Sequence, residues 1–229
     1  MNKKKNVSNI AGYIDHTLLK PNAVENDIKK LCLEAKKYNF HSVCISPVYI
    51  ELASDLLKDS KVKICSVIGF PAGHHKTEIK LYETEHALNT GAVELDMVIQ
   101  IGYLIDGNYN AVFNDIESVT RMCHQRSALI KVIIETAYLS RKEKINAAEL
   151  ILRSGADYIK TSTGFADSGA TLSDIQLLQK ILKGTHVKIK AAGGIRTHEM
   201  AVNMIWAGAD RIGTSSGVSI VKEENRIRK

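Results

Sequence analysis

The sequence has little proline, tryptophan and cysteine, and it has no long apolar run. Three prolines and fifteen glycines without a period exclude a collagenous or low-complexity chain. None of the four cysteines has a CxxC partner, so neither a disulfide framework nor a zinc knuckle is indicated. No stretch of eighteen apolar residues could span a membrane, and the lysine-rich start precedes polar residues rather than a signal-peptide core. We therefore expect a cytoplasmic protein with no membrane partner.

Length and composition are those of one globular domain. The 229 residues are 45% apolar and 24% charged, close to globular averages. The formal net charge of +6 lies mostly at the ends, in residues 3–5 and 222–229. A nucleic-acid-binding domain should carry a basic stripe on a folded face, and the body of this chain is nearly neutral. We expect a single domain over 1–229, with short basic tails at about 1–9 and 221–229 and no nucleic-acid partner.

Short β-branched runs alternate with helix-like stretches along the chain. The same Gly-Ala pair follows a helix-like stretch and precedes a strand-like run at three places, namely Gly91-Ala92, Gly155-Ala156 and Gly208-Ala209. No strong Asn-Gly hairpin signal joins two of the runs, which favours parallel pairing. The expected strands lie at about 13–15, 42–45, 62–68, 93–99, 129–134, 158–161, 187–191 and 211–213. The expected helices lie at about 27–38, 48–57, 77–89, 110–125, 141–154, 173–182 and 198–206.

Eight such units in 229 residues predict an α/β fold of the (β/α)8 TIM barrel type. An open doubly wound sheet is the alternative, and the absence of a GxGxxG motif after the first strand weakens its dinucleotide-binding form. Ser140 and Glu143 have the spacing of a capping box, which supports a helix that begins at residue 141.

Charged side chains alternate with apolar ones in four of the expected strands. Successive side chains point to opposite faces, so the charged ones point into the barrel when the apolar ones meet the helices. Burying unpaired charges costs several kcal/mol, so these groups must be ion-paired or functional. Lys160, Lys190 and Asp96 stand late in their strands, at the carboxyl-terminal rim where barrel enzymes keep their chemistry. The inward set comprises Glu94, Asp96, Lys131, Glu135, Lys160, Lys188 and Lys190.

Two lysines and one carboxylate stand near the ends of their strands, and this combination favours catalysis over a purely structural ion network. Each lysine raises the cost of charging the other, and a neutral lysine can attack a carbonyl carbon to form a Schiff base. A nearby carboxylate such as Asp96 would then move protons. The residues alone leave open whether Lys160 or Lys190 is the nucleophile.

Glycine-rich segments follow the seventh and eighth expected strands, at 191–196 and 213–217. Glycine lets backbone N–H groups approach an anion, and serine hydroxyls add donors. The loops after strands seven and eight are the usual phosphate site of a barrel. The sequence therefore predicts a small phosphate ester as substrate.

Seven segments carry a specific combination of motifs. They are IDHTLLK (14–20), VIGFP (67–71), ELDMVI (94–99), KVIIET (131–136), IKTSTGF (159–165), KIKAAGGIRT (188–197) and GTSS (213–216). In this order they resemble the deoxyribose-phosphate aldolase family. The resemblance implies a class I aldolase on a (β/α)8 barrel, free of metal and cofactor, and it makes a homodimer a family expectation. It also implies reversible cleavage of 2-deoxy-D-ribose 5-phosphate to D-glyceraldehyde 3-phosphate and acetaldehyde.

The resemblance implies a role for each matching residue. Lys160 matches the lysine that forms the Schiff base. Lys190 matches the second lysine, which perturbs the pKa of the first and transfers protons, and Asp96 matches the carboxylate that donates and accepts protons. The phosphate-binding positions are matched by Gly193, Gly194, Ser215 and Ser216.

The chain departs from the family pattern at a few positions. Gln100 and Ser46 stand where asparagine is common, and Ile105 replaces a common lysine. The end of the chain has no tyrosine of the kind that reaches the site in some relatives. These differences concern the rate and the contacts to sugar hydroxyls, since none of them alters the lysine pair or Asp96.

Several other polar residues have a less specific pattern. His74 and His75 resemble half a zinc site, but no HxxxH motif accompanies them, so no metal is expected. Asp15 and His16 are expected at the same rim, as donors behind the catalytic groups or as residues that close the barrel. Cys44 is expected to be a buried, inert thiol.

Other classes of protein remain as alternatives. A phosphosugar isomerase or synthase on a barrel would use the phosphate loops without paired lysines. A non-catalytic sensor of a phosphorylated ligand would keep those loops and would not need Lys160 for its function. The lysine pair beside Asp96 favours the aldolase.

Overall fold

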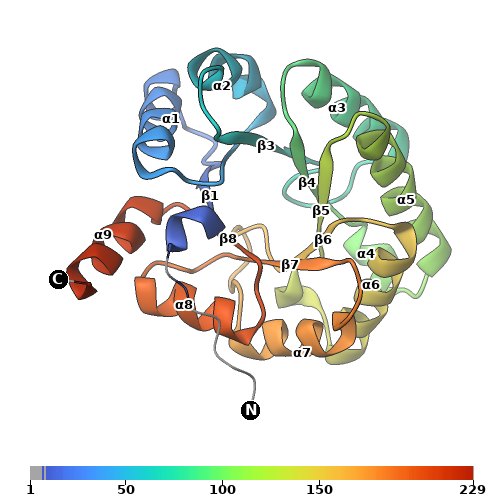
Figure 1. Cartoon of the computed structure of the whole chain (residues 1–229). Helices are drawn as coiled ribbons and strands as arrows, with labels where there is room; N and C mark the ends of the chain where they lie inside the picture. Colours follow the sequence, from blue (N-terminus) through green and yellow to red (C-terminus); the bar gives the residue numbers. More distant parts are fainter. Residues whose placement is uncertain (1–6, 8, 229) are drawn as a thin grey trace.

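Eight parallel strands close into a barrel in which each strand is hydrogen-bonded to the next and β8 to β1. The computed structural model describes residue 7 and residues 9–228 (Figure 1). The expected (β/α)8 architecture is confirmed, and the open doubly wound sheet is wrong because Ile14 pairs with Ile212. The strands are β1 (Ile14–Leu18), β2 (Ser42–Ile45), β3 (Lys63–Ile68), β4 (Glu94–Val98), β5 (Leu129–Ile133), β6 (Tyr158–Lys160), β7 (Lys188–Ala192) and β8 (Arg211–Thr214).

Helices surround the barrel and cover its outer face (Figure 1). The seven expected helices are all present, and α3 and α6 have the expected bounds. The capping box is confirmed, since Ser140 Oγ accepts from Glu143 N and Glu143 Oε2 accepts from Ser140 N. The α-helices are α1 (Glu25–Tyr38), α2 (Ile50–Leu57), α3 (Thr77–Asn89), α4 (Ile101–Ile105), α5 (Tyr109–Gln125), α6 (Arg141–Ser154), α7 (Leu172–Leu182), α8 (His198–Ala207) and α9 (Gly217–Ile227). Short 3-10 helices are η1 (Ile10–Tyr13), η2 (Pro47–Tyr49) and η3 (Thr136–Tyr138).

Helix α9 corrects the expected basic tail at 221–229. The helix runs through most of that stretch, and its residues Gly217, Ile220, Val221 and Glu224 are buried. These positions have the i, i+3, i+4, i+7 spacing of an inward helix face. A glutamate and a glycine occupy two of the four positions, so the apolar pattern is too weak to find from the sequence. The expected tail at 1–9 lies outside the described residues except for residues 7 and 9.

The layer between strands and helices is apolar, and the interior of the barrel is charged. Leu95, Ile130 and Ile159 are fully buried in the hydrophobic core that the helices cover. The side chains that alternate with them belong to the expected inward set, which is buried with one exception. Lys188, at the first position of β7, is exposed and does not join the buried charges. Its ammonium group lies 5.8 Å from the centre of the Tyr158 ring.

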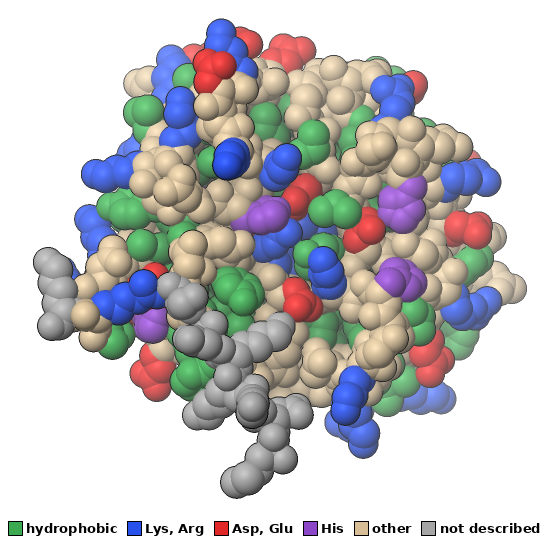
Figure 2. All heavy atoms as spheres, in the orientation of Figure 1, with side chains coloured by type: hydrophobic (Ala, Val, Ile, Leu, Met, Phe, Trp, Pro, Cys, Tyr) green, Lys and Arg blue, Asp and Glu red, His purple; other side chains and the backbone are tan. Residues whose placement is uncertain are grey.

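Basic and acidic side chains are interspersed on the face drawn in Figure 2 rather than gathered into a single stripe. Within the described part of the chain, no helix is both long enough and apolar enough to cross a membrane.

Candidate active site

Asp96 on β4 lies at the centre of a buried cluster of lysine ammonium groups. Its Oδ1 accepts a hydrogen bond from Lys131 Nζ at 3.0 Å. Its Oδ2 accepts from Lys160 Nζ at 2.8 Å and from Lys190 Nζ at 2.7 Å. Burial alone would raise the pKa of Asp96, but the three lysines hold it well below its usual value. The negative charge of Asp96 therefore holds the three lysines together.

Two further carboxylates and an arginine extend the network. Lys190 Nζ lies 2.5 Å from Asp15 Oδ2, and Lys131 Nζ lies 2.7 Å from Glu94 Oε2. Arg211 Nη1 joins the two carboxylates, at 2.8 Å from Asp15 Oδ1 and 3.2 Å from Glu94 Oε2. Burial lowers the pKa of Lys190, but its two carboxylate neighbours, Asp15 first, raise that pKa above its usual value. Lys190 is therefore held as an ammonium ion, which is the form that perturbs a neighbouring amine.

Lys160 has the fewest carboxylate partners in this network. Among the described residues, the network has four cations and three carboxylates, so positive charge is in excess. Lys131, Lys190 and Arg211 each contact two carboxylates. Lys160 contacts Asp96 alone and shares it with two other lysines. Lys160 is therefore the cation of this network with the fewest ion-pair partners.

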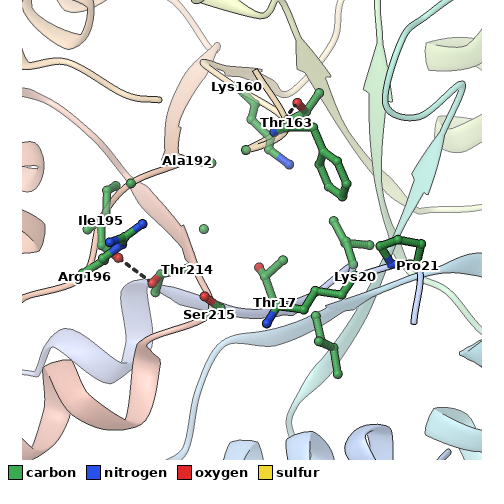
Figure 3. A pocket seen from close by; sticks show the side chains of 17 residues that line it. Thr17, Lys20, Pro21, Lys160, Thr163, Ala192, Ile195, Arg196, Thr214 and Ser215 are labelled. Carbon is green, nitrogen blue, oxygen red and sulfur yellow. Dashed lines mark hydrogen bonds between the residues drawn. The ribbon is translucent and has the colours of Figure 1, made fainter. Parts of the chain in front are cut away.

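Lys160 is also the last residue of β6, and it lines a pocket of about 410 Å³ (Figure 3). Among the described residues that line this pocket, Lys160 is the one member of the buried network. Lys160, and not Lys190, is therefore the lysine of this network that lines the pocket. The pocket is lined by Thr17, Leu18, Leu19, Lys20, Pro21, Lys160, Thr163, Gly164, Phe165, Ala192, Gly193, Gly194, Ile195, Arg196, Gly213, Thr214 and Ser215.

The glycine-rich loops after β7 and β8 form one wall of this pocket. Gly193 has a φ of +87°, and a Cβ there would approach Gly169 Cα to 2.9 Å, so the loop requires glycine. Gly194 and Ser215 also line the pocket. Ser216 instead lines an adjoining groove and stands directly before α9. The structure therefore brings three of the four candidate phosphate residues to the pocket itself.

Glu135 organises the loop that follows β6. Its backbone is left-handed, with a φ of +51°, and its side chain is buried. Glu135 Oε2 accepts hydrogen bonds from both the backbone N–H and the hydroxyl of Thr163. Thr163 Oγ1 in turn accepts from Phe165 N at 3.0 Å. This loop carries Gly164 and two further pocket residues, so Glu135 fixes part of the pocket wall without lining it.

Some polar residues have roles that the sequence did not indicate. Asp15 forms an ion pair with Lys190 and accepts a hydrogen bond from Arg211, so it acts as an acceptor behind the catalytic groups and not as the expected donor. His16 Nε2 lies 2.9 Å from Glu34 Oε2. Arg211 was missed because it begins an expected strand of only three residues, too few for the alternation to indicate which side chains point inward. Its long side chain reaches the buried carboxylates from there.

Two thiols also contact the central carboxylate. Cys65 Sγ lies 3.2 Å from Asp96 Oδ1, and Cys44 Sγ lies 3.8 Å from Asp96 Oδ2. Cys44 is therefore buried, as expected, and it lies beside the site. These three residues form the one group within the described chain that could hold a metal ion. The three ammonium groups around Asp96 disfavour a cation there, since like charges at this distance repel. Of the two adjacent histidines that resemble half a zinc site, His75 has a carboxylate neighbour, since its Nδ1 lies 3.3 Å from Glu83 Oε1.

The fold and the site define a class of enzyme. A barrel whose strand-end lysine lies in a pocket, beside a carboxylate and glycine-rich loops, is suited to covalent chemistry on a carbonyl compound that carries an anionic group. Residues 10–223 match the family described as DeoC/LacD family aldolase, and the chain belongs to this family.

Relatives and solved structures agree with this assignment. The chain is 55% identical to the deoxyribose-phosphate aldolase of Thermococcus gammatolerans over 215 residues, which is 93% of this chain and 95% of that protein. The structure of a putative deoxyribose-phosphate aldolase from Coccidioides immitis is 41% identical, with a TM-score of 0.94 over 97% of this chain and 88% of that one. The deoxyribose phosphate aldolase of Aeropyrum pernix is 36% identical, with a TM-score of 0.89 over 95% of this chain and 92% of that one. That enzyme is described as tetrameric, so the homodimer stays a prediction.

Proposed function

We propose that the chain catalyses reversible aldol cleavage of 2-deoxy-D-ribose 5-phosphate to D-glyceraldehyde 3-phosphate and acetaldehyde, with Lys160 as the amine that forms the Schiff base. The observation that carries the assignment is that Lys160 belongs both to the buried ion network and to the pocket. The named relatives support this substrate. The four cysteines are free and buried, which fits a reducing cytoplasm.

The first step is formation of the imine. Lys160 gives up a proton, and its neutral amine attacks C1 of the open-chain sugar to form a carbinolamine. Asp96 lies 2.8 Å from the Lys160 Nζ, close enough to take and return a proton as the carbinolamine loses water. The resulting iminium ion accepts electrons from the neighbouring bond.

The second step breaks the carbon–carbon bond. The C3 hydroxyl loses its proton, the C2–C3 bond breaks, and its electron pair moves toward the iminium nitrogen to give an enamine on Lys160. D-glyceraldehyde 3-phosphate leaves. The enamine is then protonated at C2, and water releases acetaldehyde and the free lysine. Lys190 Nζ shares Asp96 Oδ2 at 2.7 Å, which suits it to supply or receive protons through that carboxylate.

The phosphate group of the substrate would lie against the loops after β7 and β8. Gly193, Gly194 and Ser215 line the pocket and offer backbone N–H groups and a hydroxyl. Ser216 would contribute from the edge of the adjoining groove.

Borohydride trapping tests the nucleophile. Acetaldehyde and borohydride are added to the enzyme, and the modified peptide is mapped by mass spectrometry, because reduction converts the imine to a stable ethylated amine. We expect one adduct on Lys160, lost in the Lys160→Leu variant together with cleavage activity. The Lys188→Met variant is the matched control, since that lysine is exposed on a neighbouring strand and should leave trapping unchanged.

Each result decides between alternatives. An adduct on Lys190 would retain the mechanism and reverse the two lysine roles. The absence of a specific adduct would overturn the Schiff-base mechanism and favour the isomerase or sensor interpretation, neither of which needs a reactive lysine in the pocket.

A further inference from the structure

Two cationic side chains at the pocket have no part in the proposed chemistry. Lys20 and Arg196 line the pocket together with Lys160, and no acidic residue is among the described residues that line it. Neither has a hydrogen bond or ion pair with another side chain in the described part of the molecule. An anion in the pocket would therefore not compete with a protein carboxylate for either group.

Barrel closure places Lys20 next to the loop that carries Ser215. Lys20 follows β1, and β1 pairs with β8 so that His16 stands opposite Thr214. The loops after these two strands are therefore neighbours, although about 195 residues separate them along the chain. Figure 3 shows the Lys20 side chain on the same side of the pocket as Thr17 and Ser215. Both Lys20 and Ser215 also line the adjoining groove, so they share one edge of the pocket.

Arg196 lies on the loop after β7, which is the other neighbour of the β8 loop. It follows Gly193 and Gly194 in the segment after β7, and it lines the same pocket. Lys20 and Arg196 therefore belong to the two loops on either side of the β8 loop, because β8 lies between β7 and β1 in the barrel. The backbone N–H groups and the serine hydroxyl supply partial positive charge, and these two side chains supply full charges.

We propose that Lys20 is a specificity-determining residue, whose ammonium group binds the phosphate dianion of the substrate and makes the pocket prefer phosphorylated over unphosphorylated sugars. The proposal rests on the proposed function. A phosphomonoester carries about 1.5 to 2 negative charges at pH 7, so one cation does not neutralise it. Lys20 provides a second full charge in addition to that of Arg196, and its flexible four-carbon stem lets the ammonium follow the phosphate as a point charge.

The competing explanation is that Lys20 is an ordinary exposed lysine with its charge in water. The Lys20→Met variant separates the two, because methionine keeps an unbranched apolar stem and removes the charge. We would measure kcat and KM for 2-deoxyribose 5-phosphate and for unphosphorylated 2-deoxyribose. A charge-assisted hydrogen bond predicts that kcat/KM for the phosphorylated sugar falls by about 10- to 100-fold, mainly through KM, with a far smaller loss for the unphosphorylated sugar.

Two further variants control the experiment. Lys30→Met removes a lysine of the adjoining groove that does not line the pocket, so it should leave both substrates unchanged. Lys20→Arg keeps the charge and should restore most of the preference. Inhibition by inorganic phosphate should weaken in Lys20→Met by a factor similar to the loss in kcat/KM.

The outcome separates this proposal from the proposed function. Equal losses on both sugars, or no loss on either, would overturn the role of Lys20 in selecting phosphate. Acetaldehyde trapping on Lys160 does not involve a phosphate group, so it should persist in Lys20→Met. A failure of trapping in the unaltered enzyme would contradict the Schiff-base assignment and would leave the Lys20 result to be judged by phosphate inhibition alone.

Discussion

The Nζ atom of Lys160 lies 2.8 Å from Oδ2 of Asp96, although 64 residues separate the two in the sequence. Strand β5 stands between the strands that carry them, and both side chains point into the barrel. The same carboxylate oxygen also accepts from Lys190 at 2.7 Å. One oxygen atom is therefore in reach of two lysines, which is the relationship that a proton exchange between them requires.

Asp96→Asn should lower kcat by about 10²- to 10⁴-fold, because an amide cannot take up and return a proton. The control is Asp115→Asn, which alters a buried ion pair with Lys80, and neither of these residues lines the pocket. Both variants should lose stability, since Asp96→Asn removes a charged partner from three buried lysines and Asp115→Asn removes one from Lys80. Steady-state kinetics with urea unfolding would show the difference. A similar fall in kcat per folded molecule for both variants would contradict a proton-transfer role for Asp96.

The stability of the protein should fall in acid partly through Glu94. Burial raises the pKa of Glu94, but Lys131, His41 and Arg211 outweigh burial and bring it to about 2. A lowered pKa stabilises the fold fully above the usual value near 4.5, and this contribution is lost as the pH falls through about 2. The expected loss is on the order of 3 kcal/mol. Urea unfolding of Glu94→Gln between pH 6 and pH 2 should show a flatter profile than the unaltered protein, whereas the exposed Glu51→Gln should not.

Ser215→Asp should weaken cleavage of the phosphorylated sugar far more than acetaldehyde trapping. The introduced carboxylate would repel the phosphate at the pocket wall, and acetaldehyde has no charge to repel. Ser173→Asp, at an exposed position on α7, is the matched control. Kinetics with the phosphorylated sugar and trapping with acetaldehyde would be compared for both variants. Equal losses in the two assays for Ser215→Asp would remove Ser215 from the phosphate site.

Glu135 and Thr163 should show coupled effects on stability and on substrate binding. Glu135→Gln keeps one acceptor oxygen for Thr163, whereas Glu135→Ala leaves the Thr163 N–H and hydroxyl without it. The second change should cost about 1 to 3 kcal/mol and raise KM through the pocket wall. A double-mutant cycle with Thr163→Val, followed by urea unfolding, measures the coupling. Additive effects would show that the two side chains act independently.

Helix α9 predicts unequal effects of two truncations near the end of the chain. Val221→Ala removes a buried side chain and should cost about 1 to 3 kcal/mol. Ile227→Ala removes a larger side chain that is 72% exposed, and it should change stability by less than about 0.5 kcal/mol. Thermal unfolding would distinguish them. Equal, negligible shifts would mean that the stretch after residue 220 behaves as a tail.

The fold could be predicted because its signals are local. Strand and helix positions follow from the alternation of β-branched runs with amphipathic stretches, and the side-chain period of two put Asp96, Lys131 and Lys160 inside the barrel. Helix α4 escaped notice because five residues are too few for a periodic pattern. Helix α9 escaped notice because a buried glutamate and a glycine occupy its inward face.

The sequence by itself determined the kinds of groups at the site and the order in which the chain supplies them. Two lysines, a carboxylate and two glycine-rich loops could be placed at one rim, and motif resemblance gave the family. Residue spacing carries no information on which side chains share an atom, however, so the pairing of charges remained open.

Only the tertiary structure decided which charges meet. Barrel closure sets β1 beside β8 and brings Asp15 against Lys190 and Arg211. It leaves Lys160 with one shared carboxylate and with a place in the pocket. The same closure turns Ser216 toward the adjoining groove and sets Lys20 beside the Ser215 loop. These relationships depend on distances between residues far apart in the chain, and such distances arise from the packing of the whole barrel.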